Sequence, residues 1–191
     1  MDHTVLSKRA QKTRLAFMNA ALYLIAERGF DRVTVTDIAD AADYGRWTFY
    51  QYFESKEEAV FSAFIHWMDH LDSSLIESVK DLDFPQREYA SWRIIFQVCA
   101  QHRAFLLQLN HAEFAPWRVR IKEYLIQQFL GHIQAGRFAL MDGVRPEIAA
   151  RLYVVSLLEV LDYWGRADAP LDDMDALVDE FFIFMFRETP P

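Results

Sequence analysis

The fold is decided by residues 34–53, which read TVTDIADAADYGRWTFYQYF. We expect two short helices joined by a tight turn. Thr34, followed three residues later by Asp37, resembles a capping box, in which a hydroxyl and a carboxylate accept from free amide groups at a helix start. Asp43 tolerates the left-handed backbone with which helices commonly end, and Gly45 frees the backbone to turn again. The pattern therefore predicts a helix-turn-helix.

The second of these helices has two different faces. It runs for about two turns, from Arg46 to Tyr52. Phe49 and Phe53 are four residues apart and should both point inward. The outward face carries Arg46, Trp47, Tyr50 and Gln51, with Thr48 and Tyr52 at its edges. Guanidinium, indole, phenol and amide groups on one short helix suit a DNA groove and its phosphates better than a protein core.

A signature runs through the same stretch. Thr-x-x-x-Ile-Ala-x-x-Ala begins at Thr34, and Thr-Phe-Tyr-x-x-Phe-x-Ser-Lys begins at Thr48. The combination is similar to the signature of the TetR family of bacterial one-component transcriptional regulators, and the match extends from about Arg14 to Ala63. The resemblance implies an all-α chain, with a three-helix DNA-binding unit over residues 1–54 and a helical ligand-binding and dimerisation domain over residues 55–191.

The resemblance also implies a mode of action. Relatives of this kind act as homodimers on palindromic double-stranded DNA and are usually repressors, which a small-molecule effector releases from the operator. Activation by the same fold is the alternative. The sequence departs from the family pattern where glycine is usual at Asp43, a small aliphatic residue at Tyr44, serine at Gly45, a small residue at Trp47 and histidine at Tyr52. The expected scaffold is compatible with these changes.

The family's usual DNA contacts fall on identifiable residues of this chain. Arg46 and Gln51 are expected to read base edges, because arginine commonly pairs with guanine and glutamine with adenine. Phosphates are expected to be held by Thr36, Thr48, Tyr50, Tyr52 and Lys56, and Thr34 belongs to the same surface. Trp47 either lies on a sugar or a thymine methyl group, or packs sideways against Tyr44 without touching DNA.

The charge distribution agrees with an N-terminal DNA contact. The net charge is −8, yet residues 1–53 hold seven basic and six acidic side chains, while residues 54–191 hold 13 and 22. Candidates for a basic footprint are Lys8, Arg9, Lys12, Arg14, Arg46 and Lys56. The alternative is that these are ordinary solvated charges.

The remaining sequence predicts further helices. Residues 1–11 should fray, and helices are expected over about residues 12–28, 55–79, 88–100, 102–111, 117–135, 146–163 and 171–187. The last of these contains FFIFMF, which has no polar face and would promote aggregation if exposed. We therefore expect the last two helices to pair with those of a second copy. The residues predicted at that interface are Leu152, Val155, Leu158, Tyr163, Phe181, Phe182 and Met185.

An effector pocket is predicted between the helix over residues 55–79 and the helices spanning residues 88–135. Its candidates are Phe64, Trp67, Met68, Trp92, Phe96, Phe105, His111, Phe114, Trp117 and Tyr124. This composition indicates a largely apolar ligand, with Glu113, His111 or Gln97 to orient it. The alternative is that most of these aromatic residues are simply core.

Other classes of function have less support. No nucleophile elbow, phosphate-binding loop, dinucleotide fingerprint or zinc signature is present, so we expect neither an enzyme nor a cofactor. Glu159 and Asp162 are a buried acid pair, partners of Arg151 or Arg166, or residues that line a pocket. His66 and His70 are four residues apart but lack the other ligands of a metal site. A pure interaction module would explain the apolar helices but not the outward Arg46.

Cysteine usage and hydropathy indicate the compartment. Cys99 is the single cysteine and lies in an apolar run, so we expect a buried small side chain in a reducing cytosol. No run of about 18 apolar residues occurs, and the first residues lack the apolar segment of a signal peptide. The sequence therefore predicts a cytoplasmic protein with no membrane span.

Overall fold

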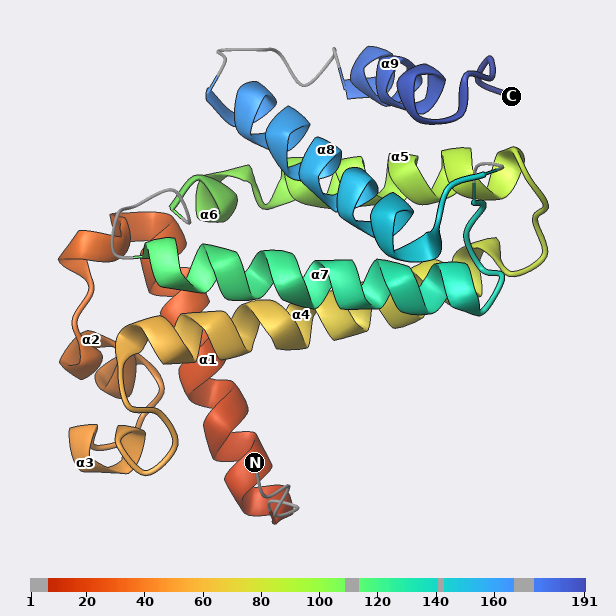
Figure 1. Cartoon of the computed structure of the whole chain (residues 1–191). Coiled ribbons are helices and arrows are strands. Elements are labelled where there is room, and N and C mark those ends of the chain that lie inside the picture. Colours follow the sequence, from red (N-terminus) through yellow and green to blue (C-terminus); the bar gives the residue numbers. More distant parts are fainter. Residues whose placement is uncertain (1–6, 109–113, 141–142, 167–173) are drawn as a thin grey trace. The chain divides into compact units, whose positions relative to one another are not determined.

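The computed structural model describes residues 7–108, 114–140, 143–166 and 174–191, and every regular element in these ranges is helical (Figure 1). The α-helices are α1 (Lys8–Arg28), α2 (Val35–Ala41), α3 (Arg46–Phe49), α4 (Lys56–Val79), α5 (Gln86–Gln101), α6 (Arg103–Gln108), α7 (Ala115–Gln134), α8 (Pro146–Arg166) and α9 (Met174–Phe186), with a 3₁₀ turn η1 (Phe30–Arg32). The all-α fold is thereby confirmed. None of the helices in the described ranges is long and apolar enough to cross a membrane.

The chain divides into two compact units. The first comprises Met1–Asp69 with Gln108–Trp117, and the second comprises His70–Leu107 with Arg118–Pro191. The division runs through α4 and α7, so each of these helices contributes residues to both units. The functional boundary expected after residue 54 stays a prediction.

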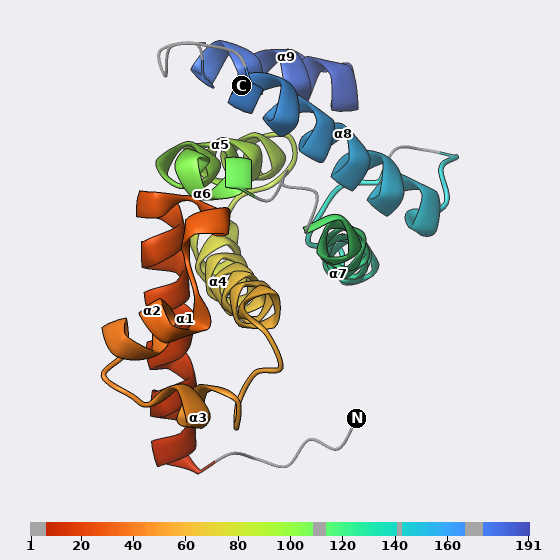
Figure 2. The ribbon, with the colours of Figure 1, turned by 90° about the vertical axis from the view of Figure 1, so that its left-hand side faces the viewer.

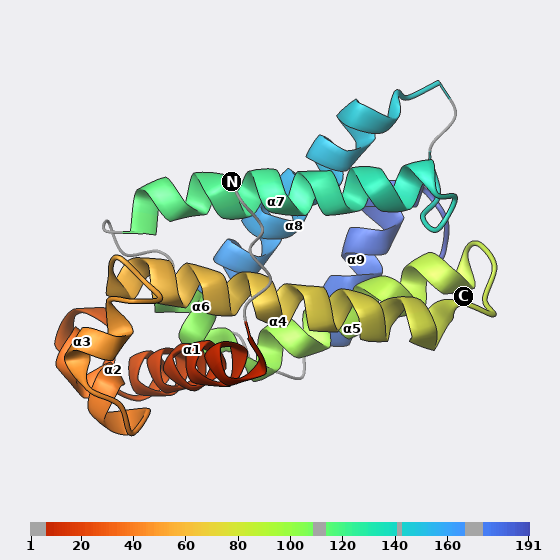
Figure 3. The same ribbon diagram turned by 90° about the horizontal axis from the view of Figure 1, so that it is seen from below.

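In the first unit, α1, α2 and α3 lie together (Figures 2 and 3). Three aromatic rings hold α1 against α3 and the residues that follow it: the ring centroids of Phe17 and Phe49 are 5.3 Å apart, and those of Phe49 and Phe53 are 5.4 Å apart. None of the three side chains is more than 2% exposed. Helices as short as α2 and α3 are unstable alone, so burial of this apolar area keeps them in place.

The first helix starts earlier than the sequence indicates. Residues 8–11 were expected to fray, but α1 begins at Lys8 because the Ser7 hydroxyl accepts from the Ala10 amide at 3.3 Å and caps the helix. At the other end, Gly29 has a φ of 80° and closes the helix.

A segment remote in sequence completes the first unit. Phe114 is only 1% exposed, and its ring centroid lies 4.3 Å from that of Phe30. Trp117, in the first turn of α7, packs on Phe61 of α4 with 4.9 Å between centroids. The core of the first unit therefore depends on residues that follow α6.

The second unit has an aromatic core shared by α5, α7, α8 and α9. Trp92 of α5 stacks on Phe129 of α7 at 5.5 Å and meets Phe181 of α9 edge-on at 4.8 Å. Cys99 lies in the same unit, and burial raises the pKa of its thiol to about 12. The prediction of a buried cysteine is confirmed.

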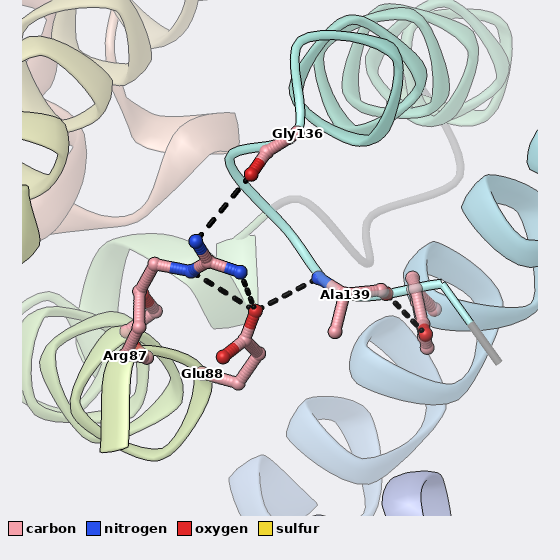
Figure 4. A network of polar contacts seen from close by, with 6 residues as sticks. Arg87, Glu88, Gly136 and Ala139 are labelled. Atoms are coloured by element: carbon pink, nitrogen blue, oxygen red, sulfur yellow. Dashed lines mark hydrogen bonds and ion pairs between the residues drawn. The ribbon is translucent and has the colours of Figure 1, made fainter. Parts of the chain in front are cut away.

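A buried carboxylate fastens α5 to the segment before α8 (Figure 4). Glu88 is fully buried, and its Oε1 accepts from Arg87 Nη2 at 2.7 Å and from the Ala139 amide at 2.8 Å. Arg87 Nη1 also donates to the carbonyl of Gly136 at 3.4 Å. These donors replace part of the water that a buried carboxylate loses; all of them reach Oε1, and Oε2 has no hydrogen-bond partner among the described residues. The sequence held a signal for this residue, since Glu88 shares an apolar helix face with Trp92 four residues later.

Candidate DNA-binding surface

The capping box predicted at the start of α2 is present. The Thr34 hydroxyl accepts from the Asp37 amide at 3.1 Å, and the Asp37 carboxylate accepts from the Thr34 amide at 2.8 Å. The Thr34 hydroxyl and amide both lower the pKa of Asp37, because each donates to its charged form. Thr34 is therefore occupied at the helix start, although its side chain is exposed.

The turn after α2 is a Schellman motif. Asp43 has a φ of 61°, in the left-handed region predicted for it. Its amide donates to the carbonyl of Asp40 at 3.1 Å, and the amide of Tyr44 donates to the carbonyl of Ala39 at 3.0 Å. Asp43 thus performs the backbone role for which glycine is usual, and the helix ends where the sequence indicates.

Gly45 plays a different part from the one expected. Its φ of −74° and ψ of 148° are extended values that any residue adopts, and a Cβ added there would meet nothing within 4 Å. The left-handed residue of the turn is Asp43, so the turn does not need the freedom of glycine at position 45. A side chain is tolerated at this N-cap position.

The reading helix is shorter than predicted. Regular α-helix covers Arg46–Phe49, and the chain then tightens, with the amides of Gln51 and Tyr52 donating to carbonyls three residues earlier at 3.2 Å and 2.9 Å. A tightened last turn satisfies the end of a short helix whose carbonyls would otherwise lack partners.

Tyr44 ties this turn to α1. Its hydroxyl lies 3.2 Å from that of Thr13, and its ring centroid is 5.3 Å from that of Phe17. The Thr13 hydroxyl lies 3.1 Å from the carbonyl of Arg9. Because Thr13 has one proton, which it donates to that carbonyl, the proton between the two hydroxyls comes from Tyr44. Tyrosine here adds an anchor between the turn and the first helix.

The polar face predicted for the reading helix is open to solvent. The exposed side chains are Arg46, Trp47, Tyr50 and Gln51, and the half-buried ones are Thr48 and Tyr52. Thr36 of α2 is also exposed. The structure therefore presents together most of the side chains that the sequence assigns to DNA.

Trp47 projects from this surface. It is 76% exposed, and within the described residues it makes no ring contact. The ring of Tyr44 packs on Phe17 rather than on Trp47. Among the described residues no ring contact joins Trp47 to Tyr44, so the structure gives no support to the arrangement in which Trp47 packs sideways on Tyr44.

Lys56 is partly engaged inside the unit. Its ammonium donates to the carbonyls of Phe30 at 2.9 Å and Val33 at 3.1 Å, and lies 3.9 Å from the centroid of the Phe30 ring. An ammonium group has three donors, so one remains after these two bonds. The sequence could not reveal this role, because 26 residues separate Lys56 from Phe30.

The other basic candidates lie at the start of α1. Lys8, Arg9 and Lys12 are exposed. The Arg14 guanidinium is instead placed over the Phe53 ring, 5.2 Å from its centroid, which packs the charge against the first unit's aromatic core.

The predicted pocket residues divide between the two units. Phe64 and Phe114 are buried in the first unit, where Phe64 contacts Trp67 at 5.8 Å. Met68 and Trp117 also belong to the first unit and are half-buried. Trp92, Phe96 and Tyr124 belong to the second unit, in which the first two are fully buried. Phe105 lies in α6, Gln97 is exposed, and His111 and Glu113 lie outside the described residues.

The residues predicted at the dimer interface form two groups. Leu152 and Val155 are each 51% exposed, Tyr163 is 72% exposed and Leu158 is half-buried. Phe181, Phe182 and Met185 are instead buried in the protomer's own core.

The inward orientation of these α9 residues has a physical cause. α9 packs on α5, and the Phe182 ring meets that of Tyr89 at 5.5 Å. Residues on the other side of α9 remain outside: Ile183 is 47% exposed and Phe184 is 72% exposed. The α9 surface left open to a second copy is therefore Ile183 with Phe184.

The acidic and metal-binding alternatives gain no support from the geometry. Glu159 is exposed, so it does not form a buried acid pair with Asp162. In the ranges that the structure describes, no three His, Cys, Asp or Glu side chains are grouped closely enough to hold a metal ion.

The geometry defines a helix-turn-helix DNA-binding protein. Residues 17–63 match the sequence model of the bacterial regulatory proteins of the tetR family. Over these residues the chain is similar to this family of transcriptional regulators.

The chain is also similar to individual regulators. It is 23% identical over 175 residues to the HTH-type transcriptional regulator YerO of Bacillus subtilis, a match that covers 85% of this chain but only 61% of that protein. A fatty acid metabolism regulator protein of the same organism is 25% identical over 141 residues, covering 73% and 70%. The solved structure of FadR from Bacillus subtilis in complex with stearoyl-CoA has a TM-score of 0.65 at 20% identity, covering 90% of this chain and 96% of that one.

Proposed function

We propose that the protein is a transcriptional repressor that binds a near-palindromic operator as a homodimer and leaves it when a small, largely apolar effector binds. The observation that carries this proposal is the exposed face of α3 and of the turn that follows it, with Arg46, Trp47, Tyr50 and Gln51 outside and Phe49 fully buried beneath. A rigid aromatic base with groove-reading side chains on its outer face suits DNA recognition.

The roles on this surface follow from side-chain chemistry. Arg46 and Gln51 read base edges in the major groove. Trp47, exposed and without ring contacts in the described part of the chain, lies on a sugar or a thymine methyl group. Thr36, Thr48 and Tyr52 donate to phosphates, and Lys56 does so with its remaining donor. These contacts fix the register of the helix on the duplex.

The homodimer forms through α8 and α9. Exposed apolar side chains on α8 recur at Ile148, Leu152 and Val155, on one side of the helix, and Ile183 with Phe184 adds to them on α9. Exposed apolar surface of this kind commonly marks an interface. Two copies related by a two-fold axis bind half-sites about one helical turn or a multiple apart.

Arg46→Ala is expected to relax the preference for one base pair per half-site by about 1–3 kcal/mol, because the side chain that contacts base edges is removed. The measurement is selection of binding sites from random DNA by wild type and variant, followed by titration of the consensus and its single-base variants. Wild type should give a near-palindrome, and the variant should lose information at one position of each half-site.

Lys56→Ala serves as the comparison for Arg46→Ala. It should weaken binding to all sequences alike and reduce the slope of log K against log salt by about one for each phosphate that the protein no longer neutralises. The binding measurement on Lys56→Ala must be accompanied by thermal melting, because Lys56 also donates to two carbonyls of the first unit.

A non-palindromic consensus, or a consensus unchanged by Arg46→Ala, would contradict the proposed reading mode.

The effector is taken up by the second unit, beside its aromatic residues. The abundance of buried rings there, Trp92 and Phe96 among them, favours an apolar ligand. The relative bound to stearoyl-CoA makes long-chain acyl-CoA thioesters the first class to examine. A ligand releases DNA only if it binds the DNA-free state more tightly than the DNA-bound one.

An acyl-CoA effector is expected to stabilise the protein and weaken its DNA complex together. At 100 times its Kd the ligand should add about 2.7 kcal/mol to the free energy of unfolding. Thermal melting and DNA binding by fluorescence anisotropy would be followed across a series of acyl chain lengths, with free coenzyme A as the control. Stabilisation without release of DNA, or no response at any chain length, would exclude this class of effector.

A further inference from the structure

Arg46 does not extend freely from the reading helix. Its Nη2 donates to the hydroxyl of Tyr50 at 3.3 Å, and its guanidinium carbon lies 5.6 Å from the centroid of the Tyr50 ring. The two residues are four positions apart, so they are neighbours on one face of the helix. Arg46, which is expected to read a base, therefore contacts Tyr50, which is expected to bind a phosphate.

Tyr50 has a firm base for this contact. Its ring meets that of Phe49 edge-on, with centroids 5.6 Å apart. Phe49 is fully buried and packs in turn on Phe17 at 5.3 Å and on Phe53 at 5.4 Å. The position of the Tyr50 ring is thus set by the aromatic core of the first unit, whereas the hydroxyl remains at the surface.

A tyrosine hydroxyl can serve both neighbours at once. It accepts from the Arg46 guanidinium through an oxygen lone pair, and its own proton is then free to be donated to a phosphate oxygen. A hydrogen bond from a charged donor is stronger than one between neutral groups. Fixing an arginine side chain costs rotamer entropy. Because the Arg46 side chain already contacts a ring that is held in place, less of this entropy is lost when DNA binds.

We infer that Tyr50 is a positioning residue for base recognition, which holds the Arg46 guanidinium in the orientation that reads one base pair. This inference rests on the proposed function, because it assigns the specificity of the same surface. This positioning role differs from the role of a tyrosine that only contacts phosphate. A phosphate is present at every sequence, so a tyrosine that only held phosphate would contribute equally to all DNA.

The test is Tyr50→Phe, which keeps the ring and removes the hydroxyl. Affinities are measured for the selected operator and for the same operator with the Arg46-dependent base pair changed. Tyr50→Phe should reduce the ratio of these two affinities about fivefold, the size expected for one hydrogen bond. Tyr50 is 46% exposed, so the variant should melt as wild type does.

Tyr52→Phe is the matched control. Tyr52 also offers its hydroxyl near the DNA, but its ring packs on Phe17, at 6.1 Å between centroids, and not on Arg46. Tyr52→Phe should weaken both complexes equally and leave the affinity ratio unchanged. In an Arg46→Ala background, Tyr50→Phe should have no further effect on the ratio, because the group that it positions is gone.

The outcomes separate this inference from the proposed function. If wild type selects no preferred DNA sequence, the proposed function itself fails. If wild type shows an Arg46-dependent preference that Tyr50→Phe leaves intact, only the positioning role is overturned, and Tyr50 acts on phosphate alone. The positioning role would also be overturned if Tyr50→Phe changed the ratio of the two operator affinities equally in the wild-type and the Arg46→Ala backgrounds.

Discussion

Phe184→Asp is expected to give a folded monomer, whereas Phe182→Asp is expected to prevent folding. Both residues lie in the apolar end of α9, two positions apart, but Phe184 is 72% exposed and Phe182 is 0% exposed. An aspartate at position 184 stays solvated in the monomer and is buried without a partner only when a second copy covers it. The substitution should therefore abolish the dimer and leave the protomer fold intact.

At position 182 the same change affects the protomer itself. The Phe182 ring packs on Tyr89 at 5.5 Å and on Phe186 at 5.0 Å, inside the second unit's core. Replacing it removes a buried aromatic ring and buries an unpaired charge, at a cost of about 5 kcal/mol or more. That cost approaches the whole stability of an ordinary domain, about 5–15 kcal/mol.

Sedimentation velocity and thermal melting distinguish the two outcomes. Tyr23→Asp is the control, since Tyr23 is an aromatic residue of α1, in the first unit, and is 60% exposed. It should remain a dimer that melts near the wild-type temperature. A Phe184→Asp variant that stays dimeric at wild-type concentrations would place the interface on another surface. A well-folded Phe182→Asp dimer would contradict the core assignment.

The different exposure of Phe182 and Phe184 could not be predicted from the sequence. The segment FFIFMF is apolar throughout, so nothing in it marks which side faces out. The sequence therefore predicts burial for the whole segment and assigns Phe181, Phe182 and Met185 to the interface. Only packing against α5 sets the phase of the helix, and that packing puts these three residues inside.

Local features, by contrast, could be predicted closely. The capping box of Thr34 and Asp37 and the left-handed turn at Asp43 depend on groups within a few residues of one another. The inward Phe49 and the outward Arg46 follow from helical spacing within one stretch. The fold class and the exposed reading face are accessible from sequence for this reason.

Interactions across long separations could not be predicted in the same way. The carbonyl partners of Lys56 lie 26 and 23 residues away. Phe114 and Trp117 were assigned to the effector pocket because aromatic residues line pockets as well as cores. The structure places both in the first unit, Phe114 on Phe30 and Trp117 on Phe61.

Phe114→Ala is expected to destabilise the first unit by about 3–5 kcal/mol, the usual cost of removing a buried phenylalanine ring. Phe114 is 1% exposed, and its ring lies 4.3 Å from Phe30, which is fully buried. Phe30 in turn supports the ammonium of Lys56 at 3.9 Å from its centroid. Removal of the Phe114 ring should loosen this end of α4 and weaken DNA binding, although no residue of α3 has changed.

Amide hydrogen exchange locates the effect. In Phe114→Ala, protection should fall in α1 and in the first turns of α4, which belong to the same unit. The control is Phe138→Ala, which removes an equally large ring that is 7% exposed and packs on Trp92 in the second unit. Its decrease in protection should fall on α5 and α7 instead. Because local unfolding follows the packing that each ring makes, the same pattern in both variants would mean that Phe114 is not part of the first unit's core.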